Sequence, residues 1–261
     1  MKQRIVVVSD CTDVAFNEIR ASILKELGDD WDKAIIEPLV PAKEFSLING
    51  AFLVRLLSEL YSPEETIFLV VLNPLTTISE YKARIYGETL NGFRFVGANT
   101  GTLNWLIEDF GLKSLYELNA PGLTGNEFIP FGGKFVHAPL VAKIVKGITF
   151  ESLGTKRNKE FLSKLKIEDG CVVSIDNFGI VKIKGKIEID EGKKYDIYVN
   201  GKRKFSATAT YSMKDLADGS IVIYPGSSLN KMPEICKVRE LDSAKSLNLN
   251  IGDIITWKNQ K

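Results

Sequence analysis

The sequence predicts two domains: an α/β domain with a mostly parallel sheet, followed by a smaller all-β, barrel-like domain. Three observations support this. The run at residues 66–72 (TIFLVVL) is apolar throughout, as expected of a strand buried on both faces of a parallel sheet. Amphipathic helical segments alternate with short apolar strands up to about residue 150. From residue 170 onward, short strand-like runs separated by turn residues make up the chain.

The first domain, residues 1–155, is predicted to open with a strand, a helix and a second strand. Residues 4–8 form an apolar run that stops at a polar turn, as at the start of an α/β unit. Residues 13–27 then place apolar side chains on one helical face, with Asp13 as N-cap and Gly28 as the stop. Residues 34–40 form the second, short strand.

The rest of this domain continues the alternation of helices and strands. A second amphipathic helix is expected over residues 45–61, before the buried strand at 66–72. A further strand over residues 93–96 leads into a polar turn at residues 98–101. Short helices are expected at residues 103–110 and 139–146.

Residues 156–167 are rich in lysine and are interpreted as a linker to the β domain at residues 168–261. Within that domain, Asn200-Gly201 separates two strand-like runs and predicts a tight hairpin. The density of short strands and turns favours a small barrel or sandwich.

Composition excludes several functional classes. The 34 basic and 33 acidic residues give a net charge of +1, whereas nucleic-acid binding needs a basic excess or patch. The three cysteines are far apart and show neither metal-ligand spacing nor a disulfide framework, so we expect no metal and a reducing, cytoplasmic location. The sequence starts without a signal-peptide pattern and has no apolar run near the ~20 residues of a membrane helix. Nucleotide-binding glycine loops and a hydrolase Gly-x-Ser-x-Gly elbow are missing as well.

Five segments of the chain form a recognisable pattern: the strand end Ser9-Asp10-Cys11-Thr12, the run TIFLVVLNPLTT, the turn Ala98-Asn99-Thr100-Gly101, the segment GGKFVHAP at 132–139, and Asp176-Asn177-Phe178-Gly179-Ile180. In their order and residues, these segments resemble one enzyme family, the S-adenosylmethionine hydroxide adenosyltransferases, relatives of the fluorinases and chlorinases. The resemblance covers nearly the whole chain. It implies a homotrimer whose sites for S-adenosylmethionine, as substrate or ligand and with no further cofactor, lie between subunits.

The resemblance also implies roles for individual residues. Asp10 would hold the two ribose hydroxyls, which suits a carboxylate because its two oxygens accept two hydrogen bonds. Phe178 would stack on adenine and Asp176 would face the methionine ammonium group. Further ligand contacts are expected from polar residues of two loops, Asn99, Thr100, Ser227 and Ser228.

The catalytic positions differ from the family pattern. Asn73 stands where the family has aspartate, and an amide carries no charge with which to act as a base. Gly132 stands at the family histidine, while His137, the only histidine, lies five residues later and is interpreted as a helix-entry residue. The family arginine would be replaced by Arg84 or Lys82. The candidate catalytic residues are therefore Arg84, Lys82 and Asn73.

Two functions follow from this pattern, and the sequence leaves both open. One is hydrolysis of S-adenosylmethionine to adenosine and methionine by attack of water at C5′. The alternative is a catalytically silent nucleoside-binding or regulatory protein on the same scaffold. Each candidate residue also has a plain structural interpretation: Asp10, Asn73 and Asp176 as turn residues, and Arg84 as a surface charge.

Overall fold

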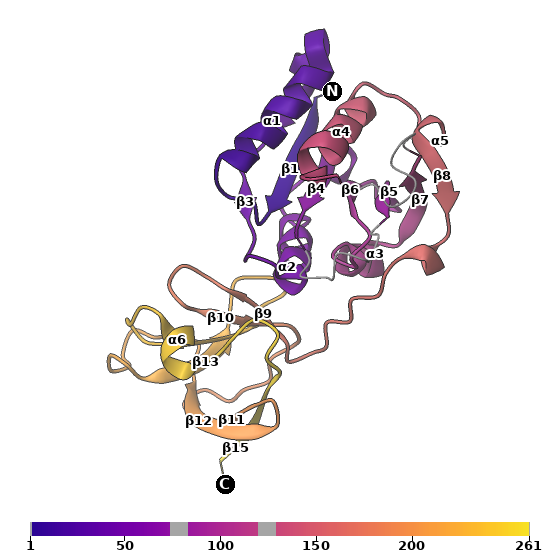
Figure 1. Ribbon diagram of the computed structural model, residues 1–261. Helices are drawn as coiled ribbons and strands as arrows, with labels where there is room; N and C mark the ends of the chain where they lie inside the picture. The colour runs from indigo at the N-terminus through magenta and orange to yellow at the C-terminus, as the bar shows by residue number, and fades with distance from the viewer. Residues whose placement is uncertain (1, 74–82, 120–128, 261) are drawn as a thin grey trace. The chain divides into compact units, whose positions relative to one another are not determined.

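The computed structural model describes residues 2–73, 83–119 and 129–260, and the chain divides into two compact units (Figure 1). Unit 1 spans Met1–Leu165 and unit 2 spans Lys166–Lys261. The predicted linker, residues 156–167, is divided between them. Lys156 and Arg157 pair with Tyr116 and Leu115, respectively, so this segment begins as part of the sheet of unit 1.

Unit 1 is built on an eight-stranded sheet. Its strands are β1 (Gln3–Ser9), β2 (Ala34–Ile36), β3 (Val40–Pro41), β4 (Thr66–Val71), β5 (Arg84–Thr89), β6 (Arg94–Ala98), β7 (Leu112–Leu118) and β8 (Gly154–Arg157). The order along the sheet is β2-β1-β4-β6-β5-β7-β8, and β3 also pairs with β1. Strands β1, β2, β3, β4 and β6 pair in parallel.

The helices of unit 1 cover both faces of this sheet (Figure 1). The α-helices are α1 (Val14–Leu27), α2 (Leu47–Leu57), α3 (Asn104–Phe110), α4 (Ala138–Val145) and α5 (Phe150–Leu153). Alternate residues of β1 point to opposite faces. Ile5 and Val7 pack in the cluster that contains α1 and α4, while Val6 and Val8 pack with α2 and α3. The shorter turns of helix are η1 (Gly28–Lys33), η2 (Pro63–Glu65), the π-helix η3 (Gly133–His137) and η4 (Lys159–Phe161).

Most predicted elements of unit 1 are confirmed. All six residues of β4 are buried, as its apolar run requires. Asp13 caps α1 by accepting a hydrogen bond from the Ala15 amide, and Gly28 follows the helix with a φ of 57°. The helix expected over 45–61 is shorter, because Ser46 caps its start at Leu47 and the α-helix ends at Leu57, with Ser58 as the C-cap. The strand expected over 34–40 is divided into β2 and β3.

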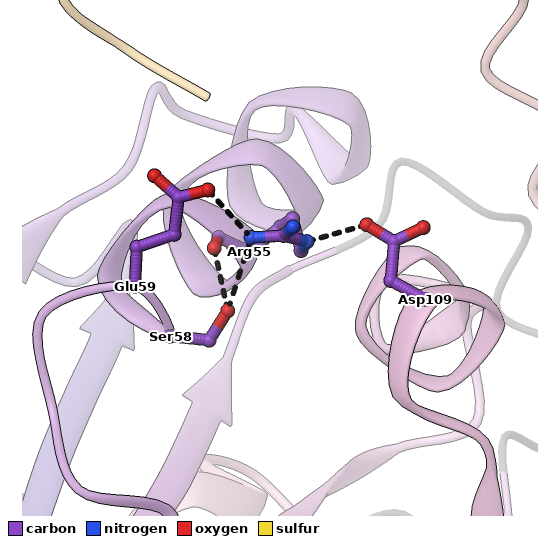
Figure 2. Close-up of polar contacts among 4 residues, drawn as sticks. All are labelled: Arg55, Ser58, Glu59 and Asp109. Carbon is purple, nitrogen blue, oxygen red and sulfur yellow. Dashed lines mark hydrogen bonds and ion pairs between the residues drawn. The ribbon is translucent and has the colours of Figure 1, made fainter. Parts of the chain in front are cut away.

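An arginine between α2 and α3 joins these helices on one face of the sheet (Figure 2). The Arg55 side chain is 13% exposed, and its Nε donates to Asp109 Oδ2 at 2.5 Å. A second contact joins Arg55 Nη1 to Glu59 Oε1 at 3.4 Å, and the guanidinium lies 4.9 Å from the Phe110 ring centroid. Figure 2 shows Arg55 between Ser58 and Glu59 of its own helical segment and Asp109 of α3. These contacts hold the two helices together.

Unit 2 contains a seven-stranded, mostly antiparallel sheet in the order β15-β11-β12-β13-β14-β10-β9. The predicted hairpin at Asn200-Gly201 is confirmed, and both residues have positive φ, as a tight hairpin turn requires. Two backbone hydrogen bonds join the starts of the edge strands, at Val172 and Ile255, to neighbouring loop residues. The Val172 amide donates to the Asp253 carbonyl, and the Ile255 amide donates to the Gly170 carbonyl. The elements are β9 (Val172–Ile175), β10 (Val181–Ile183), β11 (Lys194–Val199), β12 (Lys202–Ala209), β13 (Ile221–Pro225), β14 (Pro233–Lys237), α6 (Ser243–Leu247) and β15 (Ile255–Asn259).

The all-strand expectation for unit 2 needs one correction. Helix α6 packs against β14, and its backbone is anchored where the Ala244 amide donates to the Gly179 carbonyl. Strands β12 and β13 run parallel within the otherwise antiparallel sheet, because the chain crosses over between Ala209 and Ile221 and returns in the same direction.

Candidate functional site at the carboxyl ends of the strands of unit 1

The order of strands in unit 1 changes direction at β1. After β1, the chain adds β2 and β3 on one side, and it then crosses to add β4 on the other side. Helices α1 and α2, which make these two connections, lie on opposite faces of the sheet. In open α/β sheets, a crevice for ligands lies outside the carboxyl ends of the strands at such a switch point. Here those ends are Ser9 of β1 and Val71 of β4, which are register partners.

Asp10 lies directly at this switch point and connects three loops. Its Oδ2 accepts hydrogen bonds from the Phe45 amide and from the Asn73 amide, each at 3.1 Å. The Asn73 amide also lies 3.3 Å from Oδ1. The preceding side chain strengthens the junction, because Ser9 Oγ donates to the Val71 carbonyl at 2.7 Å. A carboxylate offers about four acceptor positions, so Asp10 keeps capacity for a further donor.

The candidate catalytic residues Asn73 and Arg84 both belong to this edge of the sheet. Asn73 is exposed, and its backbone amide makes the contact with Asp10. Arg84 begins the antiparallel strand β5 and is the register partner of Ala98, the last residue of β6. The alternative candidate, Lys82, lies outside the described residues.

The segment around Gly132 lies between Arg84 and the end of β4. A Cβ placed on Gly132 would lie 3.4 Å from Arg84 Nη2. A Cβ on the next residue, Gly133, would lie only 2.5 Å from Val71 Cγ1. The two glycines therefore let the backbone approach both side chains closely, and they place the π-helix that follows beside the site.

His137 lies at the end of this π-helix and is buried, with 4% of its surface exposed. Burial and the nearby positive charge of Arg84 lower the pKa of His137 to about 3, so its imidazole is neutral at physiological pH. Within the described part of the chain, neither ring nitrogen has a hydrogen-bond partner. The sequence placed His137 at a helix entry, and it does precede α4, but its proximity to Arg84 had no signal in the sequence beyond the rarity of histidine.

Asn99 and Thr100 are at the same edge, after β6, and their side chains bond within the protein. Asn99 is buried; its Nδ2 donates to the Phe161 carbonyl and its Oδ1 accepts from the Ser163 amide, both at 2.8 Å. Thr100 Oγ1 is 2.9 Å from Thr102 Oγ1. Asn99 thus fastens the last part of unit 1 to the end of β6.

In unit 2, Asp176 and Phe178 form the turn between β9 and β10. Asp176 Oδ1 accepts from the amides of Phe178 at 3.0 Å and Ile180 at 2.9 Å, which is the geometry of a turn-stabilising aspartate. The Phe178 ring is 55% exposed and borders a cavity of about 270 Å³ within unit 2. Ile180, Met213 and Leu241 contribute further apolar surface to this cavity.

The predicted serines lie in the loop between β13 and β14. Ser227 is exposed, whereas Ser228 is buried and its carbonyl accepts from the Met232 amide. Next to this loop, the buried carboxylate of Glu234 forms an ion pair with Lys182 at 2.5 Å. A Cβ on Gly226 would lie 2.2 Å from the Glu234 carboxyl group, so the loop packs directly on this pair.

These observations define unit 1 as a three-layer α/β domain with a polar site at its switch point. A family model, the SAM hydroxide adenosyltransferase N-terminal domain, matches residues 5–154. The chain therefore belongs to the SAM hydroxide adenosyltransferase family. No match is found among the curated proteins.

Two solved structures share the fold of nearly the whole chain. An uncharacterized conserved protein from Thermotoga maritima has 21% sequence identity and a TM-score of 0.78, covering 97% of this chain and 100% of its own. A conserved hypothetical protein from Thermus thermophilus has 19% identity and a TM-score of 0.76, covering 99% of this chain and 100% of its own.

Membrane-spanning helices and metal clusters are not found in the described residues. No described helix has the length and apolar character to cross a membrane. No described cluster of histidine, cysteine, aspartate and glutamate side chains has the three members needed to hold a metal ion.

Proposed function

We propose that this protein binds S-adenosylmethionine at the switch point of unit 1 and hydrolyses it to adenosine and methionine. The observation that carries the proposal is the position of Asp10, whose carboxylate lies between the carboxyl ends of β1 and β4. The family match supports the substrate class. In the proposed complex, Asp10 accepts hydrogen bonds from the two ribose hydroxyls.

In the proposed reaction, the oxygen of water bonds to C5′ while the C5′–sulfur bond breaks. The bond electrons go to the sulfonium sulfur, giving neutral methionine thioether, and the attacking water releases one proton to solvent. Since the leaving group is already cationic, most of the protein's contribution is to hold water and substrate in line. Arg84 is proposed to orient the water, together with Asn73; Lys82 is the alternative to Arg84.

The proposal extends to the remaining candidate residues and to assembly. Phe178 would stack on adenine and Asp176 would contact the methionine ammonium. Ser227 and Ser228 would make further contacts with the ligand. Family resemblance further suggests a cytoplasmic homotrimer in which neighbouring subunits complete each site. Asn99 and Thr100 would contribute mainly by stabilising the fold around the site, because their side chains already form hydrogen bonds within the protein.

A silent nucleoside-binding protein is the second candidate. Two residues favour it: Asn73 stands where the family has a charged aspartate, and Gly132 stands where the family has a histidine. Loss of general acid–base assistance alone costs roughly 10²–10⁴-fold in rate. Both candidates predict binding of S-adenosylmethionine, and adenosine formation separates them.

The test is calorimetric titration with S-adenosylmethionine, with chromatography for adenosine on the same samples. Asp10→Ala should weaken binding by about 1.5–3 kcal/mol, because charge-assisted hydrogen bonds are lost. Asp13→Ser is the matched control: it removes a carboxylate three residues away but keeps a helix-capping oxygen. Equal affinities for wild type and Asp10→Ala would refute the proposed role of Asp10.

The cysteines provide an independent readout of where the ligand binds. Cys11, next to Asp10, is partly exposed, whereas Cys171 and Cys236 are buried. Bound nucleoside should therefore slow alkylation of Cys11 while leaving the buried Cys171 unchanged. An unchanged alkylation rate at saturating ligand would contradict binding at the switch point.

A further inference from the structure

We infer that the cavity of unit 2 holds a planar nucleobase by stacking and shape alone, so that this chain does not select adenine over other purines. The inference deepens the proposed function and rests on it for the identity of the ligand as a nucleoside. Three features of the cavity carry it: an apolar wall with an exposed ring, charged side chains that are bonded elsewhere, and backbone groups that are already paired.

The wall of the cavity is mainly apolar. The Phe178 ring is 55% exposed and borders the cavity, and Leu241 beside it is 72% exposed. Large apolar side chains that remain in contact with water around a cavity are typical of a ligand site. The volume of about 270 Å³ lies just below the roughly 300–1,000 Å³ of pockets that enclose drug-sized ligands, so it suits one planar ring system.

The charged side chains around the cavity have partners within unit 2. Arg239 forms an ion pair with Asp218, and its other two guanidinium nitrogens donate to backbone carbonyls within residues 213–216. Lys237 Nζ lies 3.2 Å from Glu240 Oε2. A base that used these charges to hold its edge would have to compete with the contacts that they already make.

Backbone groups at the cavity are paired as well. The Ile180 amide donates to Asp176 Oδ1 at 2.9 Å, and its carbonyl accepts from the Asp176 amide at 3.1 Å. The Phe178 amide donates to the same carboxylate oxygen, and its carbonyl accepts from the amide that precedes α6. On the other side of the cavity, the Lys237 amide donates to Ser243 Oγ at 2.8 Å. These backbone groups are therefore not available to read the edge of a base.

The consequence is weak discrimination between bases. Stacking on an aromatic ring tolerates any base, because every base has a flat face. Strong discrimination comes from hydrogen bonds to the edge of a base, since a site built to make such bonds leaves its own groups unpaired when the wrong ligand binds. Adenosine carries an amino group at C6, inosine a carbonyl oxygen and purine riboside a hydrogen. The cavity should treat these three nucleosides nearly alike.

Calorimetric titration of the full chain with adenosine, inosine and purine riboside tests this expectation directly. The three dissociation constants should agree within about threefold. A preference for adenosine of more than about tenfold, which corresponds to one hydrogen bond, would overturn the inference. Failure of all three nucleosides to bind would overturn it too.

Methyl NMR tests whether the base enters this cavity. Protein labelled with ¹³C-methyl methionine gives a signal from Met213, which lines the cavity, and a control signal from Met232, which is buried elsewhere in unit 2. The ring current of a bound base should shift the Met213 signal and leave that of Met232 in place. An unmoved Met213 signal at saturating adenosine would refute this placement. The measurement uses the wild-type protein and needs no turnover.

Two variants test recognition by stacking. Phe178→Leu should weaken the binding of all three nucleosides to the same extent, by roughly 5–100-fold, because a stacked base loses its aromatic partner. Tyr211→Leu is the matched control: it removes a ring that is 65% exposed in the same unit but does not line the cavity, and it should keep wild-type affinity. Unequal losses among the three nucleosides in Phe178→Leu, or equal losses in the two variants, would contradict stacking as the basis of recognition.

The outcomes separate this inference from the proposed function. Similar affinities for the three nucleosides and a shifted Met213 signal, without binding of S-adenosylmethionine, would support the unselective cavity and remove the proposed function. Hydrolysis of S-adenosylmethionine together with a strong preference for adenosine would leave the proposed function standing and overturn the unselective cavity.

Discussion

The only histidine of the chain should make the protein less stable at acidic pH. Folded His137 has a pKa of about 3, against about 6.5 for an exposed histidine, so the unfolded chain binds the extra proton first as pH falls. The contribution of the neutral ring to the free energy of unfolding is therefore fully present above pH 6.5, and it is lost progressively as the pH falls toward 3. At about 1.4 kcal/mol per pKa unit, the loss is about 2 kcal/mol between pH 8 and pH 5, and about 4 kcal/mol at pH 3.

Urea unfolding of wild type and His137→Phe at several pH values measures this contribution. The carboxylates titrate in both proteins, so the difference between their free energies of unfolding isolates the imidazole. We expect this difference to change by about 2 kcal/mol from pH 8 to pH 5, in the direction that favours the phenylalanine variant at low pH. A difference independent of pH over this range would refute the burial of a neutral ring.

Two ion pairs make further predictions. Arg55→Met should lower the free energy of unfolding by about 1–2 kcal/mol, because it removes the charge-assisted hydrogen bond and the ring contact of a mostly buried guanidinium. The control Arg20→Met, at an exposed position of α1, should change this free energy by less than about 0.5 kcal/mol. Equal effects of the two variants in chemical denaturation would contradict the role given to Arg55. Lys182→Met should cost about 3–5 kcal/mol, since it leaves the Glu234 carboxylate buried and unpaired. Lys166→Met, which removes an ion pair exposed on the surface, should lower the free energy of unfolding by less than about 1 kcal/mol. Thermal melts compare the two variants, and a similar loss of stability in both would exclude a special role for burial.

Local patterns in the sequence identified the parallel core of unit 1 correctly. The apolar run of β4 is buried along its whole length, and the capping aspartate and closing glycine of α1 have their expected roles. The Asn200-Gly201 turn was equally predictable, because its positive φ angles suit those two residues. In each case the determining interactions lie within a few residues of one another.

The antiparallel half of the first sheet was not predicted. Strand β5 contains Arg84, Gly87 and Glu88 among its apolar residues, so it lacks the uniform apolar pattern of β4. A hairpin signal was present, because Asn91-Gly92 separates β5 from β6. What stabilises β5 is its pairing with β6 and β7, and the partner β7 is distant in sequence.

The candidate site divides in the same way. Asp10 was selected from the sequence through the family resemblance, and its position after an apolar strand places it at the carboxyl edge of the predicted sheet. The engagement of Asn99 with residues 161–163 could not, since those partners are more than 60 residues away. The same holds for His137, whose burial beside Arg84 depends on a π-turn and on two glycines that admit close backbone contact.

By itself, the sequence determined the α/β class of unit 1, the strand-rich character of unit 2 and the acidic residue at the end of β1, because apolar periodicity and turn residues act over short distances. Only the tertiary structure decided which strands became neighbours, which polar side chains were already engaged, and that the histidine was buried. These depend on contacts between distant segments, whose free energy no local pattern reports.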